Sequence, residues 1–235
     1  RALTADRILV ITGTSRGIGR YLAEHYAGLG WSVVGCSRKD NDLSIDGYRH
    51  YPVDITDEDA VVEWISSVHH EFGWIDALIN NAGSASMNHV LLTPGSTVDR
   101  LFNLNFKGTF LVSREVAKVM HQEKNGRIIN FSSIATSLAL EGEAVYASSK
   151  AAVVTYSRVL ARELASMNIT VNVISPSVVQ TDLVKGVPKE KLKKLLERMA
   201  ISRYSTLGDV SNVTDFFLSP ESSMITGQVI TIGGW

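Results

Sequence analysis

The sequence predicts an α/β fold: a doubly wound, mostly parallel sheet of seven strands with helices on both faces. Two observations lead to this prediction. Short runs rich in Ile and Val alternate with helical patterns from one end of the 235-residue chain to the other. This richness in Ile and Val is expected of parallel strands that are buried on both faces. Strands that alternate with helices are joined by right-handed crossovers, which cover both faces of the sheet.

The expected strands are, in chain order, ILVIT (8–12), WSVVGC (31–36), YRHYPV (48–53), IDALIN (75–80), GRIINFS (126–132), ITVNVIS (169–175) and QVITI (228–232). Helical patterns lie near residues 17–29, 57–72, 97–122, 146–167 and 209–219. Gly30 follows the first helix as a stop signal, and Asp57 and Asp209 are expected N-caps. No linker, charge block or internal repeat divides the chain, so we expect residues 1–235 to form one domain.

Residues 178–205 fit this alternation poorly. They contain the run PKEKLKKLLERM, in which Leu192, Leu195, Leu196 and Met199 recur at helical spacing with lysines on the other face. A solvated surface helix is the simpler interpretation. A substrate lid is the functional one, because the segment follows the sixth strand and interrupts the fold there. We predict the lid because of the motifs that precede it.

Composition and charge exclude several classes of protein. The chain is 45% hydrophobic and 20% charged, which is ordinary for a globular protein. Its net charge of −1 provides no basic field for nucleic acid or an anionic membrane. No apolar run approaches the roughly 20 residues that span a bilayer. Cys36 is the only cysteine, and the six histidines show no metal-ligand spacing. We therefore expect a cytoplasmic protein without a metal, a nucleic-acid partner or a membrane partner.

A glycine-rich run, TGTSRGIG (12–19), follows the first strand and opens the first helix. Gly13, Gly17 and Gly19 permit backbone angles and close approaches that a side chain would prevent. The N-terminus of the helix offers free amides and partial positive charge to a pyrophosphate. The spacing is GxxxGxG and differs from the standard GxGxxG, and a tight turn without a ligand is the alternative. We predict a dinucleotide site.

The end of the second strand indicates which dinucleotide binds. An acidic residue there would bind the ribose hydroxyls of NAD, whereas this chain has SRK at 37–39. Arg38 and Arg16, which lies in the glycine turn, could converge on a 2′-phosphate, and charge-assisted pairs of this kind are strong. The alternative is that Asp40 or Asp42 binds the ribose and the basic side chains are solvated. We predict that NADP(H) is preferred over NAD(H).

A tyrosine and a lysine lie four residues apart, Tyr146 and Lys150 in the run YASSK, and Ser133 lies thirteen residues before the tyrosine. On a helix this spacing places Tyr146 and Lys150 on one face. A free tyrosine has a pKa of about 10, and a nearby ammonium favours the phenolate. We therefore expect Tyr146 to act as general acid in reduction and general base in oxidation. Ser133 would hold the substrate oxygen, and Ser132 is a competing candidate.

From Ile8 to Gly234 the chain resembles the single-domain short-chain dehydrogenases/reductases. The family's TGxxxGxG, NNAG and active-site asparagine correspond to residues 12–19, residues 80–83 and Asn105 in NLNFKG. The thirteen-residue gap before Tyr146 selects Ser133 over Ser132. The resemblance implies a Rossmann-type fold in which Lys150 also bonds the nicotinamide ribose and Asn105 anchors a water that relays protons toward it. It implies too that residues 80–83 line the adenosine side and steady the central strand.

The expected site residues fall into two groups. The catalytic residues are Asn105, Ser133, Tyr146 and Lys150. The cofactor contacts are Gly13, Ser15, Arg16, Gly17, Ile18, Gly19, Ser37, Arg38, Asp54, Ile55, Asn81, Ala82, Gly83, Tyr146, Lys150, Pro176, Val179 and Thr181.

The chain departs from the family pattern at three places. Pro176 is followed by Ser177 where the family has glycine, so the backbone there has less freedom. The C-terminal run ITGQVITIGGW lacks the acidic or amide residue usual before Gly-Gly, which bears on subunit contacts. The chain looks most like the 3-oxoacyl-acyl-carrier-protein reductase branch, but Met167 stands where that branch often has a basic residue. This difference weakens the case for a carrier-bound substrate, and a 3-oxoacyl group, a sugar-like ketone and a steroid all stay open.

These motifs predict an oxidoreductase that interconverts a small-molecule ketone and a secondary alcohol by hydride transfer to or from NADP(H). A catalytically idle NADP(H)-binding regulatory protein is the alternative, although the Ser–Tyr–Lys trio is intact. A sugar-nucleotide epimerase or dehydratase would need an added substrate domain, for which 235 residues leave no room. We expect residues 134–145 and 178–205 to line the substrate pocket.

The two longest helical patterns carry apolar residues on more than one face. A helix inside one domain normally shows a single apolar stripe, so a second stripe indicates a subunit contact. Family members usually pair through these helices, and we expect a homotetramer built from dimers. The apolar residues are Phe106, Phe110, Leu111, Val116, Val153, Val154, Tyr156 and Leu160.

Overall fold

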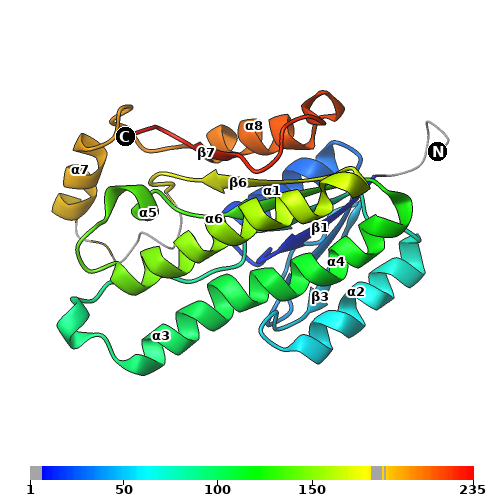
Figure 1. Ribbon diagram of the computed structural model, residues 1–235, viewed down its shortest axis with the longest axis horizontal. Helices are drawn as coiled ribbons and strands as arrows, with labels where there is room; N and C mark the ends of the chain where they lie inside the picture. Colours follow the sequence, from blue (N-terminus) through cyan, green and yellow to red (C-terminus); the bar gives the residue numbers. More distant parts are fainter. Residues whose placement is uncertain (1–6, 181–186, 188) are drawn as a thin grey trace.

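The computed structural model describes residues 7–180, 187 and 189–235, and it shows the predicted doubly wound fold (Figure 1). Every strand pair in the sheet is parallel, and the strand order is β3-β2-β1-β4-β5-β6-β7. The strands are β1 (Ile8–Thr12), β2 (Ser32–Ser37), β3 (Tyr48–Pro52), β4 (Ala77–Asn80), β5 (Gly126–Phe131), β6 (Ile169–Ser175) and β7 (Val229–Thr231). The winding reverses between β1 and β4, where such sheets open a crevice at the carboxyl ends of their strands.

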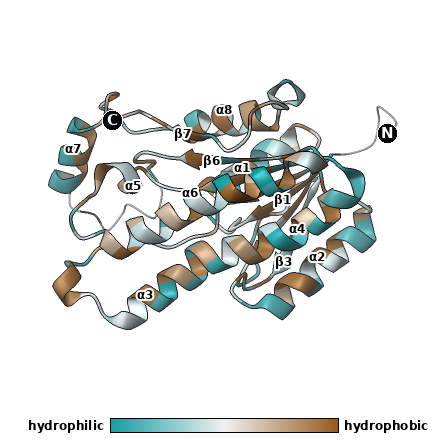
Figure 2. Cartoon of the chain, viewed as in Figure 1, coloured by the Kyte–Doolittle hydropathy of each residue, from teal (hydrophilic) through white to brown (hydrophobic). Residues whose placement is uncertain are grey.

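Helices cover both faces of this sheet. Along β1, Val10 packs toward α2, α4 and α6, whereas Leu9 and Ile11 pack toward α1 and α8, so successive side chains enter opposite cores. Figure 2 shows hydrophobic (brown) strands inside and hydrophilic (teal) patches on the covering helices. The covering helices are α1 (Gly17–Gly28), α2 (Glu58–Phe72), α4 (Thr109–Glu123), α6 (Ala144–Leu164) and α8 (Leu207–Leu218).

Shorter elements lie at the carboxyl edge and in the connections. They are η1 (Val90–Leu92), α3 (Gly95–Phe102), η2 (Asn103–Gly108), α5 (Ala135–Leu138), η3 (Ala165–Met167), α7 (Lys189–Glu197) and η5 (Pro220–Ser222). The single helix expected over 97–122 is in fact α3 and α4 joined by η2, a turn of π-helix. Such turns are rare and often lie at functional sites. This one contains Asn105.

Two of the three predicted helix boundary residues are confirmed. The Asp57 side chain accepts hydrogen bonds from the backbone amides of Asp59 and Ala60, and Gly30 follows α1 with a left-handed φ of +81°. Asp209 is not an N-cap. Thr206 caps α8, and Asp209 is the third helical residue of a capping box with it. The prediction was wrong because a hydroxyl and a carboxylate three residues apart can each cap a helix.

Candidate active site

The glycine-rich turn between β1 and α1 adopts angles that favour glycine. Gly13 has φ +78° and Gly17 has φ +60°, both in the left-handed region. The backbone amides of Gly13 and Thr14 donate to the carbonyl of Cys36, at 2.8 and 3.2 Å. The turn is thereby tied to the end of β2, and α1 begins at Gly17 with its first-turn amides at the carboxyl edge of the sheet.

Gly19, expected among the cofactor contacts, lies behind this turn. It is buried, and a Cβ atom there would lie 2.2 Å from the Gly13 carbonyl oxygen and 2.4 Å from Asn81 Nδ2. Asn81 Nδ2 donates to the carbonyls of Thr12 and Gly13, at 3.1 and 3.2 Å. Thr12 Oγ1 accepts from the amides of Asn81 and Ala82. Gly19 therefore lets α1 and the 81–82 backbone pack directly against the turn.

Asn80 joins the central strands to the helices that cover them. Its Nδ2 donates to Ser113 Oγ on α4 at 2.9 Å and to Asn130 Oδ1 on β5 at 2.8 Å. Asn130 Nδ2 in turn donates to Ser157 Oγ on α6 at 2.8 Å. These bonds are buried, so they hold β4 and β5 in register beneath the site.

A cavity of about 730 Å³ runs along the carboxyl ends of β1, β2 and β4. It brings together most of the expected cofactor contacts: Gly13, Ser15, Arg16, Gly17, Ile18, Ser37, Arg38, Asp54, Ile55, Asn81, Ala82 and Gly83. Lys39 and Asp40 also line it. Sequence reasoning missed three apolar lining residues, Cys36, Val53 and Leu104. Cys36 and Val53 are the last residues of predicted strands, which is the signal that could have identified them.

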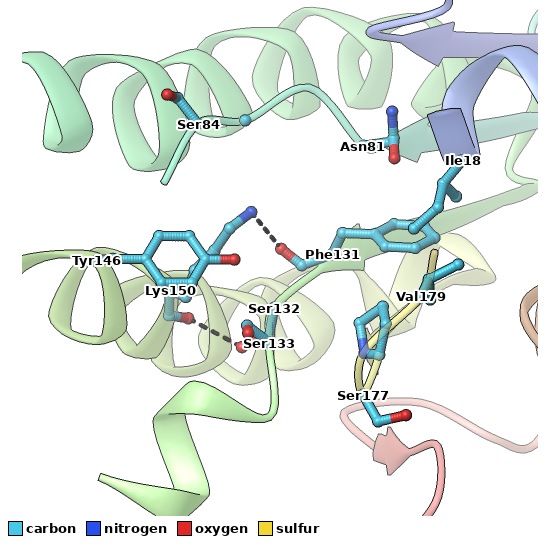
Figure 3. A pocket seen from close by; sticks show the side chains of 12 residues that line it. Ile18, Asn81, Ser84, Phe131, Ser132, Ser133, Tyr146, Lys150, Ser177 and Val179 are labelled. Carbon is cyan, nitrogen blue, oxygen red and sulfur yellow. Dashed lines mark hydrogen bonds between the residues drawn. The ribbon is translucent and has the colours of Figure 1, made fainter. Parts of the chain in front are cut away.

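A second, smaller cavity of about 130 Å³ continues from the first and contains the expected catalytic trio (Figure 3). Ile18, Asn81 and Gly83 line both cavities. The other lining residues are Ser84, Phe131, Ser132, Ser133, Tyr146, Lys150, Pro176, Ser177 and Val179. The trio, Pro176 and Val179 are therefore brought together as expected, whereas Thr181 lies outside the described residues. Ser84 and Phe131 were not anticipated.

The structure distinguishes the two adjacent serines. Ser132 is buried, and its hydroxyl donates to the backbone carbonyl of Lys150 at 3.3 Å. The Ser133 hydroxyl accepts from the amide of Ala135 at 3.2 Å, and it lowers the pKa of the neighbouring Tyr146 phenol. Ser133 is thus the serine that lies beside the phenol.

Burial dominates the electrostatics of this second cavity. Tyr146 is 8% exposed and Lys150 is 5% exposed. Burial raises the pKa of Tyr146, the hydrogen bond from Ser133 lowers it by less, and the Glu143 carboxylate raises it further. Burial also lowers the pKa of Lys150 to about 8, and Lys150 Nζ donates to the Phe131 carbonyl at 2.9 Å. The structure does not show the expected lowering of the Tyr146 pKa by Lys150, because desolvation of the phenol is the largest influence and raises that pKa.

Asn105 lies behind the cavity wall and is fully buried. Its Oδ1 accepts from the amide of Ser84, and its Nδ2 donates to the Ser84 carbonyl and to Ser149 Oγ, all at 2.9 Å. Between Asn105 and the cavity lies Gly83, where a Cβ atom would be 3.1 Å from Asn105 Oδ1 and 3.2 Å from Lys150 Nζ. Gly83 thus allows the asparagine and the lysine to approach the same stretch of backbone.

The segment 178–205 is closed at its base. Val179 and Ser205 form an isolated parallel bridge, and the Ser205 amide donates to the Val178 carbonyl at 3.0 Å. The hydroxyls of Ser177 and Ser205 are 2.6 Å apart. Ser177, where the family pattern has glycine, therefore has a defined partner at the point where the segment leaves the sheet.

The far part of this segment packs over the region expected to line the substrate pocket. Met199 and Leu195 form a small apolar cluster with Ile134 and Leu138. Arg198 Nη2 donates to the Leu138 carbonyl at 2.6 Å. α7 and the residues that follow it are therefore attached to α5 and to Ile134, which follows Ser133.

Two further features bear on the class of site. Across residues 7–180, 187 and 189–235, no group of three or more His, Cys, Asp and Glu side chains is arranged to hold a metal ion. No helix in the described part of the chain has the length and apolar character needed to cross a membrane.

Comparisons with known proteins agree with this geometry. The family described as enoyl-(acyl carrier protein) reductase matches residues 13–234. The 3-oxoacyl-[acyl-carrier-protein] reductase FabG of Escherichia coli (strain K12) is 30% identical, covering 97% of this chain and 96% of its own. FabG of Thermotoga maritima is 32% identical over the same shares of the two chains.

Solved structures show the same similarity in three dimensions. ElxO with NADP bound has a TM-score of 0.89 and 27% identity, covering 97% of both chains. The ligand-free aldohexose dehydrogenase of Thermoplasma acidophilum has a TM-score of 0.90 and 27% identity, covering 97% of this chain and 93% of its own. The glycine turn and the Ser–Tyr–Lys trio lie at one edge of the sheet, and the family described above matches residues 13–234. The chain therefore belongs to the short-chain dehydrogenase/reductase family of oxidoreductases.

Proposed function

We propose that the protein is an NADP(H)-dependent carbonyl reductase, which interconverts a ketone and a secondary alcohol with Tyr146 as general acid and base. The observation that supports this most is that the two cavities adjoin, since they share the lining residues Ile18, Asn81 and Gly83. The larger cavity therefore borders the one that contains Ser133 and Tyr146, and hydride transfer from a dinucleotide to a carbonyl requires such proximity.

The larger cavity suits a dinucleotide that carries a 2′-phosphate. Arg16, Arg38 and Lys39 are exposed on its wall, around the point where β2 ends. The left-handed glycines and the start of α1 supply backbone amides for the pyrophosphate. The cations would pair with the 2′-phosphate, whereas a ribose hydroxyl would gain little from them.

The acidic residues near this cavity support the same preference. Asp42 Oδ1 lies 2.5 Å from Arg20 Nη1, and this bond holds the pKa of the Asp42 carboxyl below its usual range. Asp42 is thus engaged with α1 and does not line the cavity, while Asp40 does. Of the two ribose ligands considered above, only Asp40 remains.

The trio divides the chemistry of the carbonyl oxygen. A nicotinamide cofactor supplies or accepts the hydride at C4 of its ring. The Ser133 hydroxyl orients the substrate oxygen, and Tyr146 gives it a proton in reduction and takes that proton back in oxidation. A tyrosine is protonated at neutral pH even with its ordinary pKa of about 10, and burial raises the pKa of Tyr146 further, so the phenol is present as a donor for the reductive direction. Lys150 lies one helical turn away, and its positive charge favours the Tyr146 phenolate after the tyrosine has given up its proton.

Asn105 fits the proposed proton relay through its backbone. Its side-chain amide is occupied by Ser84 and Ser149. Its carbonyl accepts from Thr109 Oγ1 at 2.9 Å. We place the relay water on this carbonyl.

The substrate pocket is proposed to lie between residues 134–145 and the lid at 178–205, within one domain of residues 1–235. The relatives differ in the substrates that their names give, an acyl-carrier ketone for FabG and an aldohexose for the Thermoplasma enzyme. Met167 argues against the carrier-bound substrate, and a free ketone is the proposed class.

We propose a homotetramer that pairs through α4 and α6. Leu111, Val116, Val153 and Leu160 of these helices are buried in the core. A second stripe, formed by Phe106, Phe110 and Tyr156, is only half-buried, and its rings contact one another edge to face. Sedimentation velocity of the wild type and of Phe110→Glu tests this assignment, and a monomeric wild type would contradict it.

Calorimetric binding of NADPH and NADH to one preparation at fixed salt tests the cofactor. We expect NADPH to bind at least about tenfold more tightly, a difference of about 1.4 kcal/mol. Equal affinity, or a preference for NADH, would overturn the phosphate site and point to Asp40 as a ribose ligand. Activity is then screened with free ketones, a 3-oxoacyl thioester and an enoyl thioester. Turnover of the enoyl thioester alone would contradict a carbonyl reductase.

A further inference from the structure

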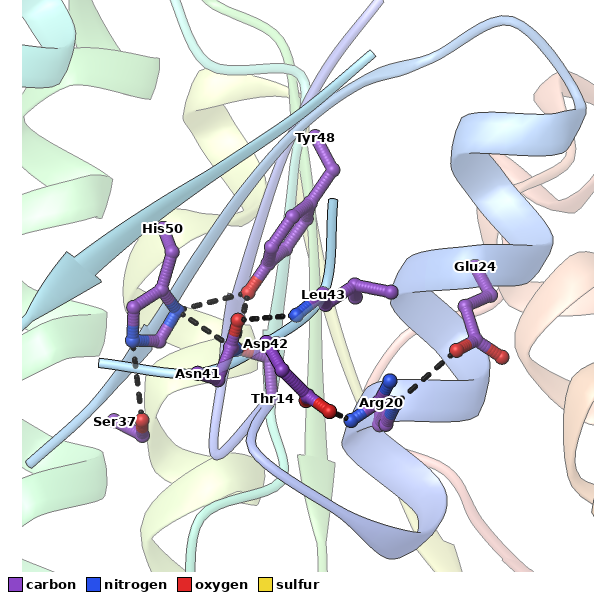
Figure 4. A network of polar contacts seen from close by, with 9 residues as sticks. All are labelled: Thr14, Arg20, Glu24, Ser37, Asn41, Asp42, Leu43, Tyr48 and His50. Atoms are coloured by element: carbon purple, nitrogen blue, oxygen red, sulfur yellow. Dashed lines mark hydrogen bonds and ion pairs between the residues drawn. The ribbon is translucent and has the colours of Figure 1, made fainter. Parts of the chain in front are cut away.

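A chain of polar contacts lies beneath the wall of the larger cavity (Figure 4). Its members are Thr14 in the glycine turn, Ser37 at the end of β2, Asn41 in the following loop, and Tyr48 and His50 on β3. We call it the Tyr48–His50 network. Ser37 lines the cavity, but Tyr48, His50 and Asn41 do not, so they lie behind the residues that would contact a cofactor.

One end of the network reaches the glycine turn. Tyr48 OH lies 2.7 Å from Thr14 Oγ1 and reaches it by passing over Gly35 of β2. A Cβ atom on Gly35 would lie 2.5 Å from Tyr48 OH and 2.6 Å from Thr14 Oγ1. Gly35 does not have a left-handed φ. A glycine is needed here because a Cβ atom would occupy the space through which Tyr48 reaches Thr14. Burial raises the pKa of Tyr48, which keeps the hydroxyl protonated and able to donate.

The other end of the network makes hydrogen bonds to the backbone of the loop after β2. The carbonyl of Lys39 accepts from Ser37 Oγ at 2.6 Å and lies 3.0 Å from His50 Nε2. A carbonyl can only accept, so Nε2 carries a proton. On the other side of the ring, His50 Nδ1 lies 3.0 Å from Asn41 Nδ2 and 2.9 Å from Tyr48 OH. Because an amide nitrogen can only donate, these partners select the neutral Nε2–H form of His50.

The position of the Asn41 side chain is itself set by the chain. Its Oδ1 accepts from the amide of Leu43 at 3.1 Å, which leaves Nδ2 to face His50. Each polar atom in the network therefore has a partner of the complementary kind. Networks satisfied in this way hold a single geometry, whereas a partly satisfied one does not.

We infer that His50, with Tyr48 and Asn41, is a positioning residue that determines preference for the 2′-phosphate without touching the cofactor. By fixing the Lys39 carbonyl, His50 sets the turn on which Arg38, Lys39 and Asp40 line the cavity. By joining Tyr48 to Thr14, the network also sets that turn relative to the pyrophosphate site. Holding cations in place beforehand lowers the cost of ordering them on binding. This inference rests on the proposed preference for NADP(H).

The test compares the dissociation constants of NADPH and NADH for the wild type, His50→Ala and His50→Gln. We expect His50→Ala to weaken NADPH binding about tenfold and to change NADH binding by less than about twofold. Glutamine can place an amide N–H near the position of His50 Nε2, so His50→Gln should recover much of the loss. His70→Ala, an exposed histidine at the end of α2, is the matched control and should change neither constant.

Tyr48→Phe provides a second variant that removes only a hydroxyl. It should also lower the ratio of NADPH to NADH affinity, by less than His50→Ala, and it keeps the test decisive if His50→Ala does not fold. The same series with adenosine 2′,5′-bisphosphate should reproduce the NADPH losses, because that probe lacks the nicotinamide end.

The outcomes separate the two proposals. A wild type that binds both cofactors equally contradicts the NADP(H) preference and the inference with it. A wild type that prefers NADPH, with variants that lose affinity for both cofactors equally or for neither, overturns the role of the network and leaves the preference intact.

Discussion

The two ends of the proposed cofactor groove use charge in opposite ways. At the β2 end, Arg16, Arg38 and Lys39 are exposed to solvent, and their positions depend on left-handed glycines and on hydrogen bonds to backbone carbonyls. At the β5 end, Tyr146 and Lys150 are buried. Burial raises the pKa of Tyr146 and lowers that of Lys150, so it favours the uncharged form of each side chain. Exposed cations can select a charged ligand, but proton transfer needs groups whose protonation the protein controls.

The largest expected effect tests the buried end. Tyr146→Phe removes the proposed proton donor, and kcat should fall by about 10²- to 10⁴-fold. The affinity for NADPH should stay within about twofold of the wild-type value, because most of the cofactor is proposed to bind in the larger cavity. Steady-state kinetics and calorimetry on one preparation measure both quantities. Tyr156→Phe, a substitution of the same kind on the same helix, is the control and should retain activity. A similar loss in both variants would contradict the assignment.

The next effect concerns the pH dependence of stability. Burial lowers the pKa of Lys150 to about 8 in the folded protein, against about 10.4 for a free lysine. Between these values the unfolded chain binds a proton that the folded protein has lost, so the free energy of unfolding rises with pH. The rise is about 1.4 kcal/mol per pH unit, or about 2–3 kcal/mol from pH 8 to pH 10.

Urea unfolding of the wild type and of Lys150→Met at pH 8 and pH 10 measures this contribution as a difference. Burial raises the pKa of Cys36 to about 12 and raises that of Tyr146, and both act in the opposite direction, since the folded protein then keeps a proton that the unfolded chain loses. Cys36 and Tyr146 are present in both proteins, so their contributions largely cancel in the difference between the wild type and Lys150→Met. If the free energy of unfolding of the wild type minus that of Lys150→Met does not increase from pH 8 to pH 10, Lys150 is charged in the folded protein.

The smallest effect tests how closely the β2 end is packed, with two glycines of α1. Gly19→Ala would place a Cβ atom 2.2 Å from the Gly13 carbonyl oxygen, and we expect a loss of about 1–3 kcal/mol in the free energy of unfolding. Nothing lies within 4 Å of a Cβ atom on Gly28, so Gly28→Ala should stabilise by up to about 1 kcal/mol. Thermal unfolding of both variants measures the contrast, and equal shifts would show that the turn can move away from α1.

Local patterns were sufficient for most of the fold. The run ITVNVIS became β6 with the predicted bounds, and the other strands agree within two residues at each end. Most of these strands are rich in Ile and Val, so the signal lies within each segment. The turn of π-helix around Asn105 had no such signal, because it depends on the packing of α3, α4 and α6 around that side chain.

The histidines show the same limit at the site. Spacing excluded His50 from a metal site and left it as an ordinary surface or core residue, since nothing in the linear pattern links it to Lys39. The contact arises because β3 pairs in parallel with β2, with His50 opposite Gly35 and Pro52 opposite Ser37. That register carries the ring under the loop that follows Ser37.

The identities and the order of the glycine turn, Ser133, Tyr146 and Lys150 follow from the chain alone, because each motif is defined by spacing over a few residues. The direction of the Tyr146 pKa does not. It is set by how far the phenol is removed from water, by the Ser133 hydroxyl of another element and by the Glu143 carboxylate. Desolvation depends on every element packed around a group, so only the folded arrangement of β5, α6 and the 178–205 segment could decide it.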